Sequence, residues 1–156
     1  MFPQPPIRLM IVFAIAVVCS LAVPVHAGQK IRVNTDEDGL AIKGYDPVAY
    51  FTLGEPTPGK ADFELVWQGS RWRFASAEHR ERFQADPDRY APRYGGFCAG
   101  GMALGRIWDI DPEAWVIVDD RLYLNWAKSG RDEFAADPEP FIARADANWE
   151  KLGKPE

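Results

Sequence analysis

Two stretches of the chain show the hydrophobic pattern of β-hairpins. In residues 63–74, Phe63, Leu65 and Trp67 alternate with polar residues, and Gln68-Gly69-Ser70 supplies a turn before the chain returns. In residues 115–124, two continuous apolar runs flank a turn at residues 119–121, which is typical of strands covered on both faces. We therefore expect two short hairpins of antiparallel strands.

Helical signals surround these hairpins. Four Asp-Pro pairs begin at Asp46, Asp86, Asp111 and Asp137; aspartate caps free amides and proline suits the first helical position. We interpret them as starts of helices or turns, not as catalytic carboxylates and not as units of a repeat. Residues 139–152 carry an apolar stripe typical of an amphipathic helix. The prediction is a small single α+β domain with several short helices packed on the hairpins and a C-terminal amphipathic helix.

The first 27 residues have the features of a secretory signal peptide. Arg8 precedes an uncharged apolar run over residues 9–23, which is shorter than the roughly 20 residues of a spanning helix. An A-x-A-like site predicts cleavage after Ala27, and retention as an anchor is the alternative. We expect a periplasmic protein with a flexible lead-in at residues 28–38 and one domain at residues 39–152.

The charge balance limits the partners that we expect. The chain has 18 Lys and Arg against 23 Asp and Glu, and removal of Arg8 with the signal peptide leaves a net charge of −6. This acidity, without a basic run, argues against nucleic acid, and no membrane association is expected after cleavage. Cys98 is then the only cysteine, so an internal disulfide is excluded and its thiol is buried, bound to a ligand or paired between chains.

A glycine-rich segment at residues 94–105 holds this cysteine. Five of its twelve residues are glycine, and a helix from about Phe97 would place Cys98 and Met102 on one face. Because glycine within a helix costs roughly 1 kcal/mol relative to alanine, these glycines need a reason. Either another part of the chain packs closely against this face, or a ligand approaches it.

Several motifs together resemble the YHS domain. They are the run G-Y-D-P-V-A-Y-F at residues 44–51, W-R-F-A-S at 72–76 and Y-G-G-F-C-A at 94–99, followed by the long-form motifs at 111–125 and 145–149. The resemblance covers nearly all of residues 39–152. It implies a small exported α+β protein of the YHS family's long form.

The resemblance also bears on metal binding. Short YHS domains carry cysteines suspected of holding a metal, but the matching positions here are Ala49, Ala75 and His79. The short-domain thiol site is therefore absent, and one cysteine excludes a tetrahedral cysteine zinc site. What remains is Cys98 with Met102 and His79, whose thiolate, thioether and imidazole suit a soft ion such as copper. The alternative is that these are ordinary core residues.

Two further hypotheses stay open. Trp108, Trp126 and Tyr123 lie near the ends of expected elements, where aromatic residues often line ligand pockets or partner surfaces. A Cys98–His79 nucleophile pair oriented by Asp46 or Asp111 would instead make an enzyme. The sequence has no nucleophile elbow, zincin helix, phosphate loop or dinucleotide fingerprint. We favour an exported, non-catalytic binding protein whose ligand is a metal such as copper, a small molecule or a protein partner.

Overall fold

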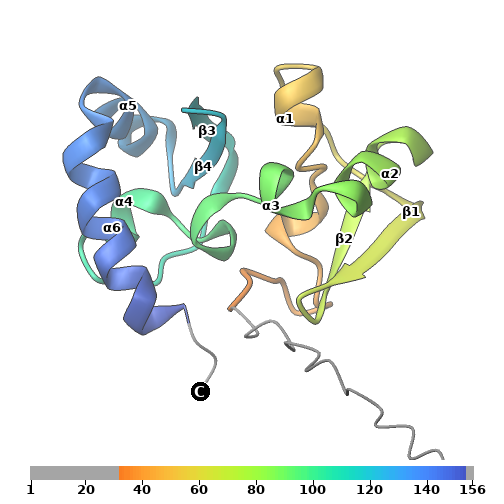
Figure 1. Cartoon of the computed structure of the whole chain (residues 1–156), viewed down its shortest axis with the longest axis horizontal. Coiled ribbons are helices and arrows are strands. Elements are labelled where there is room, and N and C mark those ends of the chain that lie inside the picture. The colour runs from red at the N-terminus through yellow and green to blue at the C-terminus, as the bar shows by residue number, and fades with distance from the viewer. Residues whose placement is uncertain (1–31, 154–156) are drawn as a thin grey trace, which may run out of the picture.

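The structure, a computed structural model, describes residues 32–153. The predicted signal peptide and the start of the lead-in lie outside the described residues. The described chain contains two two-stranded antiparallel sheets and several short helices, which confirms the predicted α+β class (Figure 1). Among the described helices, none combines the length and the apolar character needed to cross a membrane.

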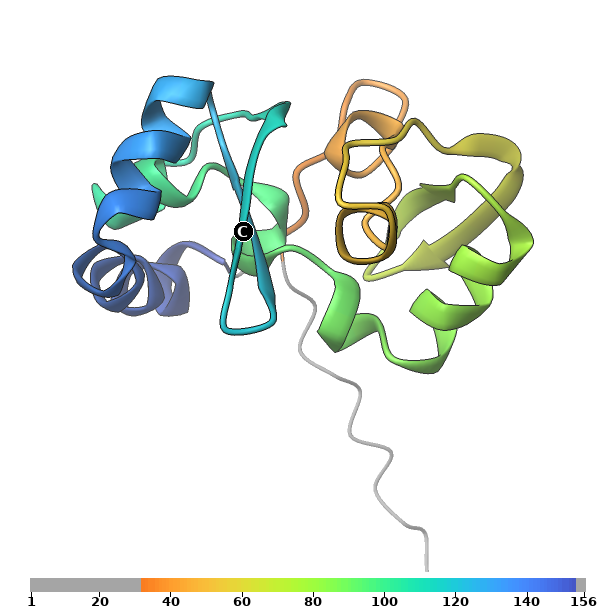
Figure 2. The ribbon, with the colours of Figure 1, turned by 90° about the horizontal axis from the view of Figure 1, so that it is seen from above.

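Both expected hairpins form, and their elements lie in two halves of the molecule. The first half contains η1 (Ile42–Gly44), α1 (Ala49–Thr52), β1 (Lys60–Trp67), β2 (Ser70–Phe74), α2 (Ala77–Ala85) and α3 (Pro87–Tyr90). The second half contains η2 (Arg93–Gly96), α4 (Ala99–Ala103), β3 (Asp111–Val118), β4 (Arg121–Asn125), α5 (Lys128–Ala136) and α6 (Pro138–Leu152). Figures 1 and 2 show the two halves side by side, joined through α3 and the segment after it.

The second half repeats the first. Each half runs from a tight turn with left-handed residues through a short helix and a hairpin to two more helices. From the hairpin onward the offset is constant, because β3, β4, α5 and α6 each begin 51 residues after their counterparts β1, β2, α2 and α3. Even the irregularity in strand pairing recurs, between Lys60 and Glu64 in β1 and between Asp111 and Trp115 in β3.

This internal repeat corrects one interpretation of the Asp-Pro pairs. The motif F-x-A-D-P occurs at residues 83–87 and again at 134–138, so two of the four pairs occupy equivalent positions. Asp86 and Asp137 both precede a helix with proline at its start, as expected. Asp111 begins a turn and not a helix: it is the first residue of β3, and its carboxylate accepts a hydrogen bond of 2.9 Å from the Glu113 amide two residues on.

The structure describes residues 32–38 of the predicted flexible lead-in, and several of them form backbone hydrogen bonds with the rest of the chain. The Asn34 amide donates to the Gly95 carbonyl at 2.8 Å, Thr35 pairs with Ala41, and the Asn34 side chain is buried. Backbone hydrogen bonds therefore link Arg32 and Asn34 to the second half, whereas Thr35 and Asp36 pair with residues 40–41. Such long-range pairing leaves no signal in a short polar stretch of sequence.

The halves share their core. One buried cluster is built mainly on the first half, around Trp72, Phe74 and Phe83, but it also takes in Cys98, Leu122 and Leu124 of the second half. A second cluster lies between the second hairpin and α4, α5 and α6, with Tyr123, Phe134 and Ala145 at its centre. Because the first cluster spans both halves, neither half buries its apolar residues alone.

Candidate functional site

The glycine-rich segment is built for close packing. Tyr94, Gly95 and Gly96 all have positive φ, and a Cβ at Gly96 would lie 2.5 Å from the Ile42 side chain. A Cβ at Gly101 would lie 2.9 Å from the indole ring of Trp108. A Cβ at Gly95 would likewise clash with the Arg32 carbonyl oxygen. Of the two explanations for these glycines, close approach of other parts of the chain is therefore observed at Gly95, Gly96 and Gly101.

Cys98 and Met102 are both fully buried. Cys98 is the N-cap of α4, and its sulfur accepts a hydrogen bond from the Gly101 amide at 3.3 Å. The Cys98 sulfur also lies 3.9 Å from Oδ1 of Asn125. Cys98 packs in the first core cluster, whereas Met102 packs in the second. The pair therefore contributes to two different parts of the core.

His79 belongs to a separate network in the first half. Its Nδ1 lies 2.6 Å from Oδ2 of Asp46, which is fully buried, and its Nε2 lies 3.1 Å from the Thr52 hydroxyl. Asp46 also accepts backbone hydrogen bonds from Val48, Ala49 and Ala75, at 2.8, 3.3 and 2.8 Å. Asp46 thus orients His79, as the catalytic hypothesis supposed, but the other ring nitrogen meets Thr52 and not Cys98.

These placements bear on the predicted metal site. Both nitrogens of His79 already have partners, and the sulfur of Cys98 already accepts an amide. Within residues 32–153, no group of three or more His, Cys, Asp and Glu side chains is placed to hold a metal ion. A site made by Cys98, Met102 and His79 stays a prediction from the sequence.

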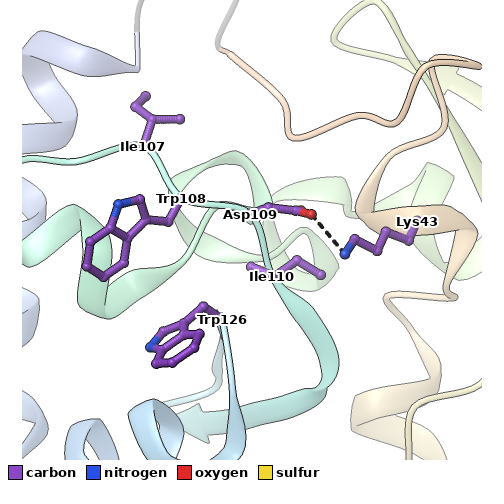
Figure 3. Close-up of a pocket in the computed structure, with 6 residues that line it drawn as sticks. All are labelled: Lys43, Ile107, Trp108, Asp109, Ile110 and Trp126. Carbon is purple, nitrogen blue, oxygen red and sulfur yellow. Dashed lines mark ion pairs between the residues drawn. The ribbon is translucent and has the colours of Figure 1, made fainter.

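A pocket of about 630 Å³ lies where the halves meet (Figure 3). It is lined by Lys43 of the first half and by Ile107, Trp108, Asp109, Ile110 and Trp126 of the second. Trp108 and Trp126 are 38% and 56% exposed, so two large apolar rings lie together at the surface of one pocket. Figure 3 shows the two indoles on one side of the pocket and the Lys43–Asp109 ion pair on the other.

Each indole rests against a glycine. The ring of Trp108 covers Gly101 in α4, and Nε1 of Trp126 would lie 2.8 Å from a Cβ at Gly130 in α5. Gly130 is the counterpart of His79 in the repeat, and Trp126 is the counterpart of Ala75. In the first half, Ala75 and His79 both hydrogen-bond to Asp46. In the second half, Trp126 and Gly130 occupy these two positions, and the indole contacts the glycine instead.

The ion pair opposite the indoles is held in place. Lys43 Nζ lies 2.8 Å from Oδ2 of Asp109, and the Asn34 side chain donates to Oδ1 at 3.1 Å. Partial burial raises the pKa of Asp109, but the hydrogen bonds from Lys43 and Asn34 outweigh burial and lower the pKa below its ordinary value. Asp109 is therefore ionised near neutral pH, with Lys43 as its counterion.

The structure separates the three aromatic residues singled out in the sequence. Trp108 and Trp126 share the pocket, whereas Tyr123 is buried in the second cluster against Tyr94 and Phe134. Lys43 and Asp109 were missed because charged residues distant in sequence gave no sign of proximity. The recurring F-x-A-D-P motif could have drawn attention to the pocket. It aligns the two halves and shows that Trp126 and Gly130 differ from their first-half counterparts.

The chain was compared with protein-family models, with curated proteins and with solved structures, and none of the three comparisons found a match. The resemblance to the YHS domain therefore stays a prediction from the sequence motifs.

Proposed function

We propose that this protein is an exported, non-catalytic binding protein whose ligand is a small molecule held in the pocket of Trp108 and Trp126. The observation that carries this proposal is the pair of exposed indoles, each in contact with a glycine and facing the Lys43–Asp109 ion pair. Concave sites with apolar and aromatic walls and a few placed polar groups are typical of ligand pockets. The volume of about 630 Å³ is within the range of such pockets.

The geometry favours binding over catalysis. A cysteine nucleophile must reach its substrate, and Cys98 is fully buried in the core. Thr52 lies beside His79, but its hydroxyl donates to the Val48 carbonyl at 3.1 Å. Asp46, which orients His79, also accepts three backbone amides, as a helix cap does. We therefore assign the Asp46–His79 pair a structural role.

Copper at Cys98, Met102 and His79 is not part of this proposal. The hydrogen bonds of His79 would have to break before a metal could bind there. A titration of residues 28–156 with Cu(I) tests the metal hypothesis separately, since the pocket of Trp108 and Trp126 contains none of these three residues.

The proposal is tested by NMR with a library of small organic fragments and ¹⁵N-labelled protein. We expect fragments to shift the indole N–H signals of Trp108 and Trp126, and Trp126→Ala to weaken their binding at least about tenfold. The matched control is Leu53→Ala. Leu53 is an apolar residue at the C-terminal end of α1 in the first half, and at 54% it is about as exposed as Trp126. Fragments that bind Trp126→Ala as tightly as the natural protein, or that shift neither indole, would contradict the proposal.

A further inference from the structure

The polar side of the pocket limits what kind of ligand fits it. Lys43 and Asp109 form a pair with no net charge, and both side chains remain partly exposed, at 44% and 64%. A cationic ligand would be attracted to Asp109 and to the indole faces, but it would be repelled by Lys43. An anionic ligand would meet the reverse conflict. The pair therefore favours a neutral ligand.

The hydrogen-bonding capacity of the pair is only partly used. An ammonium group has three donors, and Lys43 uses one on Asp109. A carboxylate has about four acceptor positions, and Asp109 accepts from Lys43, Asn34 and the Ile110 amide. A ligand would therefore meet free donors and a free acceptor side by side. Two neighbouring hydroxyl groups match this arrangement, because one can accept from Lys43 while the other donates to Asp109.

The opposite wall, formed by Trp108 and Trp126, favours a ligand with an apolar surface. Gly101 lies against the ring of Trp108, and Gly130 lies beside the Nε1–Cδ1 edge of Trp126, while both indoles keep part of their surface exposed for a ligand. Because each indole already packs against a helix at a glycine, less side-chain entropy is lost when a ligand stacks on it. Because the ion pair is still hydrated, a ligand that keeps part of its own hydration fits better than one that must be fully enclosed.

We propose that the ligand is a carbohydrate, with the apolar C–H face of one sugar ring stacked on Trp108 or Trp126 and two adjacent hydroxyl groups hydrogen-bonded to Lys43 and Asp109. A neutral sugar ring combines an apolar face with vicinal hydroxyls, and it is the ligand class that both walls of the pocket accept. This inference rests on the proposed function, since it names the ligand of the same pocket.

The test uses three probes on ¹⁵N-labelled protein, with the indole N–H signals as the readout. The probes are a set of neutral oligosaccharides (cellopentaose, maltopentaose and chitotetraose), tetramethylammonium as a cation, and riboflavin as a planar heterocycle. We expect at least one oligosaccharide to shift the Trp108 and Trp126 signals in a saturable way. We expect Asp109→Asn and Lys43→Ala each to weaken that binding at least about tenfold.

Asp132→Asn is the matched control. It removes the carboxylate of another exposed ion pair, Arg131–Asp132, in which Asp132 is 67% exposed, outside the pocket. We expect it to leave oligosaccharide binding within about twofold.

If the oligosaccharides bind the natural protein, but the Asp109→Asn and Lys43→Ala variants bind them as well as the Asp132→Asn variant does, the assigned geometry is overturned. If riboflavin, tetramethylammonium or library fragments shift the indoles and no oligosaccharide does, carbohydrate is overturned while the pocket's binding function stands. If nothing shifts them, both proposals fail.

Discussion

Substituting alanine at either of two neighbouring glycines of α4 tests whether the Trp108 ring packs on Gly101. A Cβ at Gly101 would lie 2.9, 3.0 and 3.1 Å from Cε3, Cδ2 and Cγ of the Trp108 ring. A Cβ at Gly100 would have Oδ1 of Asn125 as its nearest neighbour, at 3.5 Å, which is ordinary van der Waals contact. Neither glycine has a positive φ, so alanine is compatible with the backbone at both positions.

The magnitudes of the two effects follow from these contacts. Alanine is favoured over glycine in a helix by up to about 1 kcal/mol, so Gly100→Ala should leave stability unchanged or raise it by up to that amount. Gly101→Ala has the same helical gain, but the indole of Trp108 must move, and overpacking of this kind costs about 1–3 kcal/mol. We therefore expect Gly101→Ala to be less stable than Gly100→Ala by about 1–3 kcal/mol.

Urea unfolding followed by far-ultraviolet circular dichroism measures this difference without depending on tryptophan fluorescence. The indole N–H signal of Trp108 provides a second readout, and it should move in Gly101→Ala and stay near its position in Gly100→Ala. Equal stability of the two variants, together with an unmoved Trp108 signal in both, would refute the seating of Trp108 on Gly101. The rigid indole wall that the carbohydrate proposal requires would then lose its basis.

Two predictions concern the charged networks. Asp46→Ala removes a buried carboxylate that holds His79 and three backbone amides, so it should lower the free energy of unfolding by about 3–5 kcal/mol, measured by urea denaturation. Thr52→Val, at the exposed end of the same network, should cost less than about 1 kcal/mol, and a similar loss in both variants would contradict a central role for Asp46. Because the folded-state pKa of Asp109 is lowered, its ion pair stabilises the fold above pH 3.8 and is lost as the pH falls through the lowered pKa. Stability measured from pH 5 to pH 2 should therefore fall more steeply for the natural protein than for Asp109→Asn, and parallel curves would refute this.

Local signals in the sequence determined most of the elements. The alternation of Phe63, Leu65 and Trp67 and the apolar runs around residues 119–121 gave both hairpins, because a strand's side-chain period depends only on neighbouring residues. Asp86 and Asp137 predicted the starts of α3 and α6, and the Asp86 carboxylate accepts the Arg89 amide, because capping is a contact over three residues. The aromatic pair of the pocket was also named from its position near element ends.

Tertiary structure decided which side chains meet. Lys43 and Asp109 come from different halves, and only the packing of one half on the other brings them together. His79 pairs with Asp46, while Cys98 packs within the first cluster, because a histidine or a cysteine has no preference for one distant partner until the chain path is set. The F-x-A-D-P motif marks the repeat in the sequence, but it does not show which side chains differ in their contacts between the halves. Gly130, the counterpart of His79, leaves space for Trp126, and this contact exists only in the folded chain.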